Sequence, residues 1–290
     1  MPDNSPALVV VAAGGLGTRV HHWARFIPKE FYPVGGRPAI TRLLEEIADL
    51  GPARLAIIYH PYYEQFASWG RQVLSHHDHA RYSDAAGTQV PAAVPAGMTV
   101  SLIPQHGRYG DLTSVLNGAD YLAARDILHV AFADNLYPGP APLPLLRDTS
   151  PKDVAVLAST YRPALACTRG ILITRPGACP GNLRRVHAII EKPDPAQARE
   201  LEERHGPANL RMLEGRARLT GRFLEFARTL QHAAPGTEPK LALAIGAYAR
   251  EHPVIAVPAT GDFIDLGTPQ APPSRRRAQP APVTRPRPPA

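Results

Sequence analysis

Glycines and basic residues follow the first apolar segment of the chain. Residues 9–13, VVVAA, are small or β-branched and predict a buried strand, and GGLG at residues 14–17 predicts a turn after it. Glycines let backbone N–H groups approach an anionic ligand closely, and Arg19 and Lys29 add positive charge to the same region. Residues 9–38 therefore predict a phosphate-binding loop, with an ordinary structural turn as the alternative.

Spacing excludes two common phosphate-binding loops. A dinucleotide-binding fingerprint needs a glycine three residues after Gly17, where the chain has Val20. A Walker loop needs Gly-Lys-Ser/Thr, where the chain has Gly17-Thr18-Arg19. Neither pattern fits the chain.

A longer pattern surrounds this loop. The sequence GLGTR at residues 15–19 is followed by PKE at residues 28–30, and then by Pro33-Val34 and Arg37-Pro38. This pattern resembles the signature of sugar-1-phosphate nucleotidyltransferases, and most closely that of bacterial UTP–glucose-1-phosphate uridylyltransferases. The resemblance implies that Arg19 and Lys29 hold a nucleoside triphosphate. The loop residues that it assigns to the nucleotide are Ala13, Gly14, Gly15 and Gly17.

Strand and helix patterns alternate through the first half of the chain. Apolar residues at helical spacing predict a helix that begins at Pro38 and ends at Gly51, and apolar runs at residues 54–60, 98–104 and 127–133 predict strands. This alternation predicts an α/β fold with a parallel sheet. The resemblance implies a Rossmann-like nucleotidyltransferase fold over residues 1–270, with a mostly parallel sheet flanked by helices and a smaller sugar-binding part.

The strand at residues 98–104 delivers Gln105 to its carboxyl end. Ligands bind beyond these ends in open parallel sheets, and an amide can both donate to and accept from a pyrimidine edge. The resemblance implies that Gln105 contacts the base and that Gly110 lets base and ribose approach the backbone. Asp111 and Thr113 differ from the residues usual in the family, and a surface glutamine is the alternative for Gln105.

Two aspartates follow apolar strands far apart in the chain. Asp134 follows residues 127–133, and Asp265 lies in DLGTP after the strand predicted at residues 254–257. Carboxylates at this edge of a parallel sheet, opposite a phosphate-binding loop, suit a Mg²⁺ ion that bridges phosphates. The resemblance assigns both aspartates to that metal. A loop aspartate and a helix cap are the alternatives.

The second half of the chain carries the residues that the resemblance assigns to the sugar phosphate. Gly170, Glu191, Asn209 and Glu238 would contact the sugar, and Lys192 would hold its phosphate. The tripeptide EKP at residues 191–193 carries this assignment by its order and spacing. Lys240, Ala242 and Leu243 replace polar residues of the family and leave the identity of the sugar open.

The resemblance implies a reaction of two phosphorylated substrates. A sugar 1-phosphate, with glucose 1-phosphate favoured, would attack the α-phosphorus of a pyrimidine nucleoside triphosphate, with UTP favoured, and pyrophosphate would leave. Arg19, Lys29 and Lys192 would neutralise the charges that the two anions bring together. A catalytically weakened relative that binds sugar nucleotides as a sensor or subunit is the alternative.

Composition argues against several other classes of protein. Residues 271–290 hold five arginines, seven prolines and no acid, so they carry most of the net charge of +7. Such a tail predicts disorder, and it lacks the aromatic residues that would favour nucleic-acid binding. Neither an apolar stretch long enough to span a membrane nor a secretory signal is present, so we expect a cytoplasmic protein. The oligomeric state stays open, a homo-oligomer included.

Overall fold

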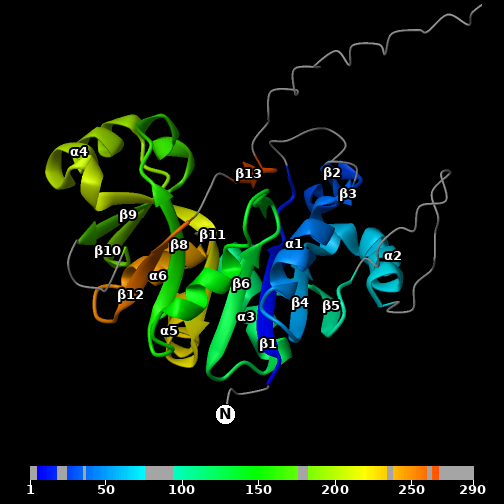
Figure 1. Cartoon of the computed structure of the whole chain (residues 1–290). Helices are drawn as coiled ribbons and strands as arrows, with labels where there is room; N and C mark the ends of the chain where they lie inside the picture. The colour runs from blue at the N-terminus through cyan, green and yellow to red at the C-terminus, as the bar shows by residue number, and fades with distance from the viewer. Residues whose placement is uncertain are drawn as a thin grey trace, which may run out of the picture.

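The computed structural model describes residues 5–17, 25–34, 37–75, 94–175, 182–233, 238–259 and 263–267. The described chain forms one nine-stranded sheet of order β5-β4-β1-β6-β11-β8-β12-β10-β9, with helices on both faces (Figure 1). Its strands are β1 (Ala7–Ala13), β4 (Ala53–Tyr59), β5 (Met98–Pro104), β6 (Ile127–Phe132), β8 (Val154–Thr160), β9 (Gly170–Arg175), β10 (Arg184–Glu191), β11 (Leu210–Thr220) and β12 (Val254–Pro258). Its helices are α1 (Ala39–Ala48), α2 (Glu64–Ser75), α3 (Asp111–Leu122), α4 (Pro195–His205), α5 (Gly221–Ala233) and α6 (Leu241–Tyr248).

β1 stands where the strand order changes direction. It pairs in parallel with β4 on one side and with β6 on the other. The chain continues from β1 to β4 on one side of β1, whereas β6 pairs on the other side. A crevice opens at the carboxyl ends of β1 and β6, where the strand order changes direction. The glycine turn after β1 and Asp134 both lie at this edge.

The second half of the sheet contains the antiparallel pairings. β11 is antiparallel to β6, β8 and β9, and β10 is antiparallel to β9 and β12. The pairing of β11 with β8 is interrupted between Leu213 and Ala217, where the register shifts. In the described sheet, β11 and β10 alone oppose the direction of β1, so the expectation of a mostly parallel sheet is confirmed.

Alternate residues of β1 face two different cores. Val9, Val11 and Ala13 pack with α1 and α2, whereas Val10 packs with α3, α5 and α6. A β carbon on Gly118 of α3 would stand 2.4 Å from Val10 Cγ2, so only a glycine lets α3 lie this close to the strand. The strand that leads into the loop is therefore fixed from both faces.

Three features differ from the patterns in the sequence. Pro38 is the N-cap of α1 rather than its first helical residue. The connection after β6 contains a 3₁₀ helix at Leu143–Asp148. α6 was not predicted at all. The expected tail at residues 271–290 lies outside the described residues, and no helix in the described part is long and apolar enough to cross a membrane.

Candidate active site

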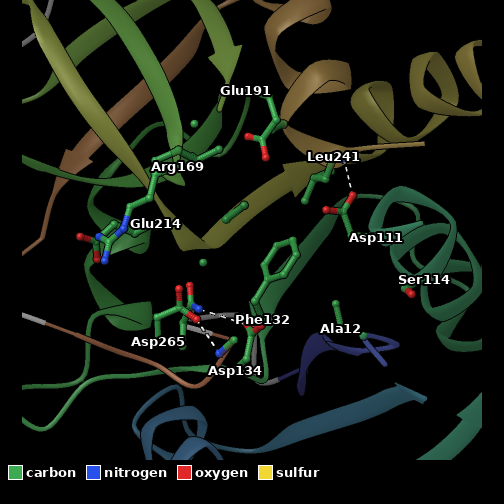
Figure 2. A pocket seen from close by; sticks show the side chains of 18 of the residues that line it. Ala12, Asp111, Ser114, Phe132, Asp134, Arg169, Glu191, Glu214, Leu241 and Asp265 are labelled. Carbon is green, nitrogen blue, oxygen red and sulfur yellow. Dashed lines mark hydrogen bonds between the residues drawn. The ribbon is translucent and has the colours of Figure 1, made fainter. Parts of the chain in front are cut away.

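A cleft of about 490 Å³ opens where β1 and β6 end. Its walls also include the start of α3, the adjoining ends of β9 and β10, the middle of β11, and α6. Asp134 and Asp265 lie together at one side of this cleft, and Glu191 lies across it (Figure 2). A cleft of this volume is typical of sites for small molecules.

Most residues that the sequence assigned to a substrate or metal line this cleft. They are Gly14, Gly15, Lys29, Gln105, Gly110, Asp134, Gly170, Glu191, Lys192, Glu238 and Asp265. Gly17 adopts a φ of +61°, a conformation that glycine reaches readily, but it is not among the lining residues. Arg19 lies outside the described residues.

Packing removes two assigned side chains from the cleft. Ala13 faces the core under α1, because strand residues alternate, and its neighbour Ala12 lines the cleft instead. Asn209 Nδ2 donates to the carbonyl of His205 at 2.9 Å, and the Asn209 carbonyl accepts from Thr174 Oγ1 at 2.9 Å. Asn209 therefore ties the end of α4 to β9, and it is not among the residues that line this cleft.

Lys29 and the two aspartates form a compact charged cluster. The Lys29 ammonium makes a short ion pair with Asp134 Oδ2, and the lysine is only 8% exposed. Two short strands, β7 (Asn135–Leu136) and β13 (Ile264–Asp265), pair so that Asp265 lies opposite Asn135. The backbone pairing of residues 130 positions apart therefore brings Asp265 to Asp134.

The cluster sets the charge state of the residues around it. Burial by itself would lower the pKa of Lys29, but the carboxylates of Asp134 and Glu30 outweigh burial and raise it. Burial raises the pKa of Glu30 to about 7, against the opposing effect of the Lys29 ammonium. Lys29 is therefore positively charged, and its ammonium lies between the glycine loop and Asp134.

Carboxylate oxygens of the two aspartates converge beside Gly267. A β carbon on Gly267 would stand 3.0 Å from Asp265 Oδ1, 3.3 Å from Asp134 Oδ2 and 3.8 Å from Lys29 Nζ, so both carboxylates and the ammonium approach the same point. Among the described residues no group of three or more His, Cys, Asp or Glu side chains gathers as a metal site. Two carboxylates are nonetheless the usual protein contribution to Mg²⁺ when substrate phosphates complete its shell. The residues present therefore fit Mg²⁺.

Gln105 closes the cleft beside the glycine loop. Its Oε1 accepts from Ser114 Oγ at 2.9 Å, and its Nε2 donates to the carbonyls of Arg108 (3.2 Å) and Gly110 (3.1 Å). A β carbon on Gly14 would stand 2.6 Å from Gln105 Oε1. Gln105 therefore holds the turn before α3 against the loop, and its amide has no spare donor in this conformation.

The segment before α6 lies on the amino end of α3. The Pro239 carbonyl accepts from Leu112 N at 3.1 Å, and Asp111 Oδ1 accepts from Leu241 N at 2.6 Å. A β carbon on Gly110 would stand 2.5 Å from that carbonyl oxygen. Burial raises the pKa of Asp111 to about 6, although the Leu241 N–H lowers it. Asp111, unusual for the family, therefore caps α6.

The opposite end of the cleft gathers charged residues from β9, β10 and β11. Glu191 Oε2 lies against Gly170, where a β carbon would stand 2.9 Å away, and Lys192 Nζ is 3.6 Å from Glu191 Oε1. The guanidinium of Arg169 stacks 3.9 Å from the ring centre of Phe263. Such a set of donors and acceptors suits a polar, anionic ligand.

A buried carboxylate stands beside Arg169. Glu214 is 5% exposed, lines the cleft, and accepts from the Tyr137 hydroxyl at 2.8 Å. Burial raises the pKa of Glu214, whereas hydrogen bonds and the charge of Arg169 lower it. Arg169 and Glu214 are shown together in Figure 2.

Solved structures of nucleotidyltransferases match nearly the whole chain. UDP-glucose pyrophosphorylase complexed with UDP-glucose matches with a TM-score of 0.69 and 19% identity, over 91% of this chain and 94% of that one. UDP-glucose pyrophosphorylase from Acinetobacter baumannii gives 0.69 and 22%, over 91% and 90%. The inositol-1-phosphate CTP transferase from T. maritima gives 0.64 and 13%, over 92% and 91%. The chain has the nucleotidyltransferase fold.

The sequence comparisons are weaker and agree with this fold. No family model matches the chain. The bifunctional protein GlmU of Paramagnetospirillum magneticum is 34% identical over 58 residues, which are 20% of this chain and only 12% of that protein. The fold that the sequence resemblance implied is therefore confirmed, while the activity stands as a proposal.

Several lining residues of this nucleotidyltransferase fold were missed in the sequence. Asp111 was noted only as a departure from the family, and Glu214 was not singled out. Arg169 precedes an assigned glycine but carries no motif of its own. They share no local signal, because Asp111 begins α3, Glu214 lies within β11 and Arg169 immediately precedes β9.

Proposed function

We propose that the protein is a nucleotidyltransferase that joins a pyrimidine nucleoside triphosphate, UTP favoured, to a sugar 1-phosphate, glucose 1-phosphate favoured. The products are a nucleotide sugar and pyrophosphate. The observation that carries this proposal is the cluster of Lys29, Asp134 and Asp265 at the carboxyl ends of β1 and β6. It shares one cleft with Glu191 and Lys192, as a reaction between two phosphorylated substrates requires.

The triphosphate would lie along the turn after β1. A β carbon on Gly15 would stand 3.2 Å from Lys29 Nζ, so the ammonium already lies against the backbone of this turn. Lys29 can neutralise phosphate oxygens there, and Arg19 is proposed from the sequence to add a second positive charge. The turn supplies backbone N–H groups without side chains that would keep the phosphates away.

The sugar 1-phosphate would enter from the opposite end. Lys192 neutralises its phosphate, and Glu191 accepts hydrogen bonds from sugar hydroxyls. One phosphate oxygen then attacks the α-phosphorus, a new P–O bond forms, and the bond to the β-phosphate breaks in line. No protein nucleophile is needed, because positioning and charge neutralisation account for most catalysis in phosphoryl transfer.

Asp134 and Asp265 are the residues that would hold Mg²⁺. The ion, when bound, supplies positive charge to the α-phosphate at the moment negative charge develops there. The Lys29 ammonium pairs with Asp134 Oδ2 and holds this carboxylate beside the glycine loop. The aspartates are hard oxygen donors, which agrees with Mg²⁺ rather than a softer metal.

A sugar-nucleotide-binding protein without catalysis is the second candidate. The Pro239 carbonyl fills the space beside Gly110, and the Gln105 amide is occupied by the chain itself. A base would have to compete with these contacts. Binding of UTP by calorimetry, with no product from any sugar 1-phosphate, would select this candidate.

The test of the proposal is pyrophosphate release from a panel of UTP, dTTP and CTP with several sugar 1-phosphates, with the product identified by mass. Asp134→Asn keeps the shape of the side chain and removes its charge, so we expect turnover to fall by about 10²-fold or more. Glu203→Gln, an exposed change on α4, is the control. Unchanged turnover of Asp134→Asn would refute the metal assignment.

A further inference from the structure

Arg216 of β11 is buried beneath the cleft and is only 1% exposed. Its Nε and Nη2 each donate to one carboxylate oxygen of Glu46, both at 2.7 Å. Its other donors reach three backbone carbonyls, those of Phe132 (3.1 Å), Gly215 (2.8 Å) and Asn135 (2.8 Å). All five guanidinium N–H groups therefore have an acceptor.

Two of these carbonyls flank Asp134. Phe132 ends β6 and Asn135 begins β7, so the guanidinium holds the backbone on both sides of the turn that carries the Asp134 carboxylate. The Asn135 side chain donates to Asp134 Oδ1 at 3.1 Å, and the Asp134 carbonyl accepts from Leu266 N at 2.8 Å, next to Asp265. A shift of this turn would therefore separate the two aspartates.

Glu46 and Tyr137 hold the guanidinium in place. Glu46 comes from α1, and the Tyr137 ring lies 4.8 Å from the guanidinium carbon. The Tyr137 hydroxyl in turn donates to Glu214, which also lines the cleft. One buried arginine thus connects α1, the turn with Asp134 and the residues near Glu214.

Only an arginine can make this set of contacts. Its planar fork donates to the carboxylate and to the carbonyls at the same time, whereas a lysine has three donors around one nitrogen. We propose that Arg216, oriented by Glu46, is a positioning residue that fixes the Asp134 carboxylate for a divalent cation. The inference rests on the proposed function for its metal, and its mechanism is the support of the 132–135 turn.

Arg218 provides a matched control on the same face of the same strand. It is 3% exposed, and it donates to the carbonyls of Leu146 (2.8 Å), Thr149 (3.0 Å) and Asp153 (3.2 Å) and also to that of Ser150. These carbonyls belong to the connection before β8 and not to the turn with Asp134. Loss of Arg218 therefore removes a comparable buried network without touching the proposed metal site.

The test is a Mn²⁺ titration of the full chain, followed by electron paramagnetic resonance, without nucleotide or sugar. The Mn²⁺ binding that is lost in the Asp134→Asn variant is assigned to this site. We expect Arg216→Lys to raise the Mn²⁺ dissociation constant about tenfold, as is typical when an outer partner of a metal ligand is lost. Arg218→Lys should leave it within about twofold of the wild type, although both variants melt at lower temperature.

Glu46→Gln is the second variant and decides the matter if Arg216→Lys does not fold. This substitution keeps the volume of the side chain and weakens its hydrogen bonds to the Arg216 guanidinium, so the Mn²⁺ dissociation constant should again rise. Equal Mn²⁺ affinities of the Arg216→Lys and Arg218→Lys variants would overturn the inference. The inference would also be overturned if the Asp134→Asn substitution removed none of the Mn²⁺ binding that the wild type shows.

The transfer assay separates this inference from the proposed function. If both hold, Arg216→Lys raises the Mg²⁺ concentration for half-maximal turnover more than it raises KM for the sugar 1-phosphate. If no pair of substrates gives pyrophosphate while the Mn²⁺ results are as expected, the proposed reaction fails and the positioning role of Arg216 stands.

Discussion

Replacing Glu30 with glutamine tests the electrostatics of the charged cluster. Glu30 lies in the 3₁₀ helix Lys29–Phe31 and is 1% exposed. Its Oε1 is 3.8 Å from Lys29 Nζ, and its Oε2 has no hydrogen-bond partner among the described residues. A buried carboxylate with so few contacts favours its protonated form. Glutamine has the same shape and no charge, so it imitates that form at every pH.

The sign of the effect follows from the two pKa values. In the unfolded chain Glu30 loses its proton near its ordinary pKa of 4.5, whereas burial raises its folded-state pKa to about 7. Between these pH values the folded protein binds more protons, so its stability decreases as the pH rises. The difference between the folded-state and unfolded-state pKa values of Glu30 corresponds to about 3 kcal/mol of unfolding free energy. The contribution is present below pH 4.5 and is lost as the pH rises through about 7.

Urea denaturation of the wild type and Glu30→Gln at pH 5, 6, 7 and 8 measures this loss. We expect similar unfolding free energies at pH 5 and a variant that is more stable by up to about 3 kcal/mol at pH 8. Glu203→Gln, on the exposed face of α4, should follow the wild type throughout. A difference between Glu30→Gln and the wild type that stays constant from pH 5 to 8 would refute the reasoning.

Two further substitutions test the walls of the cleft. Gly110→Ala would place a β carbon 2.5 Å from the Pro239 carbonyl oxygen, so urea denaturation should show a loss of about 1–3 kcal/mol, and an unchanged midpoint would contradict this contact. Glu214→Gln replaces a buried carboxylate of the cleft that can accept hydrogen bonds from sugar hydroxyls, so steady-state kinetics should show KM for the sugar 1-phosphate raised about tenfold with KM for UTP unchanged. Equal changes in both KM values would place Glu214 outside the sugar site.

Elements with local signals were predicted well from the sequence. The bounds of β5, β6 and β12 agree within one residue with the apolar runs at residues 98–104, 127–133 and 254–257. α4 also has a local start signal, because Asp194 accepts from the N–H groups of Ala196 and Gln197. Such elements depend on neighbours in the chain, which the sequence shows directly.

α6 lacks these signals and was missed for that reason. Its sequence, LALAIGAY, is apolar on every side and shows no helical stripe. Its N-cap residue, Lys240, makes no side-chain cap, and the cap comes from Asp111 instead. An acceptor 130 positions away cannot be recognised from a local pattern.

The residues of the candidate site also fall into two groups, those that local sequence patterns predict and those that only long-range contacts bring to the cleft. Gly14 and Asp134 follow strands whose carboxyl ends meet at one edge, so their meeting in one cleft could be foreseen. Glu214 reaches the cleft through the register of β11, including the interruption after Leu213, whereas Arg169 lies in the connection just before β9. A shift of one residue would turn the Glu214 side chain to the other face, and no sequence pattern fixes that register.

Arg216 and Arg218 show what such long-range contacts add. Arginines at alternate positions of a strand ordinarily indicate a solvated face, yet both side chains are buried here because each finds carbonyls of a distant connection. A buried ion pair such as Arg216–Glu46 adds little to stability beyond what well-packed apolar residues could supply. Apolar residues, however, would leave the carbonyls of Phe132 and Asn135 without donors beside Asp134. The value of the pair therefore lies in the geometry of that turn, which is why Mn²⁺ affinity, and not melting temperature, should distinguish Arg216 from Arg218.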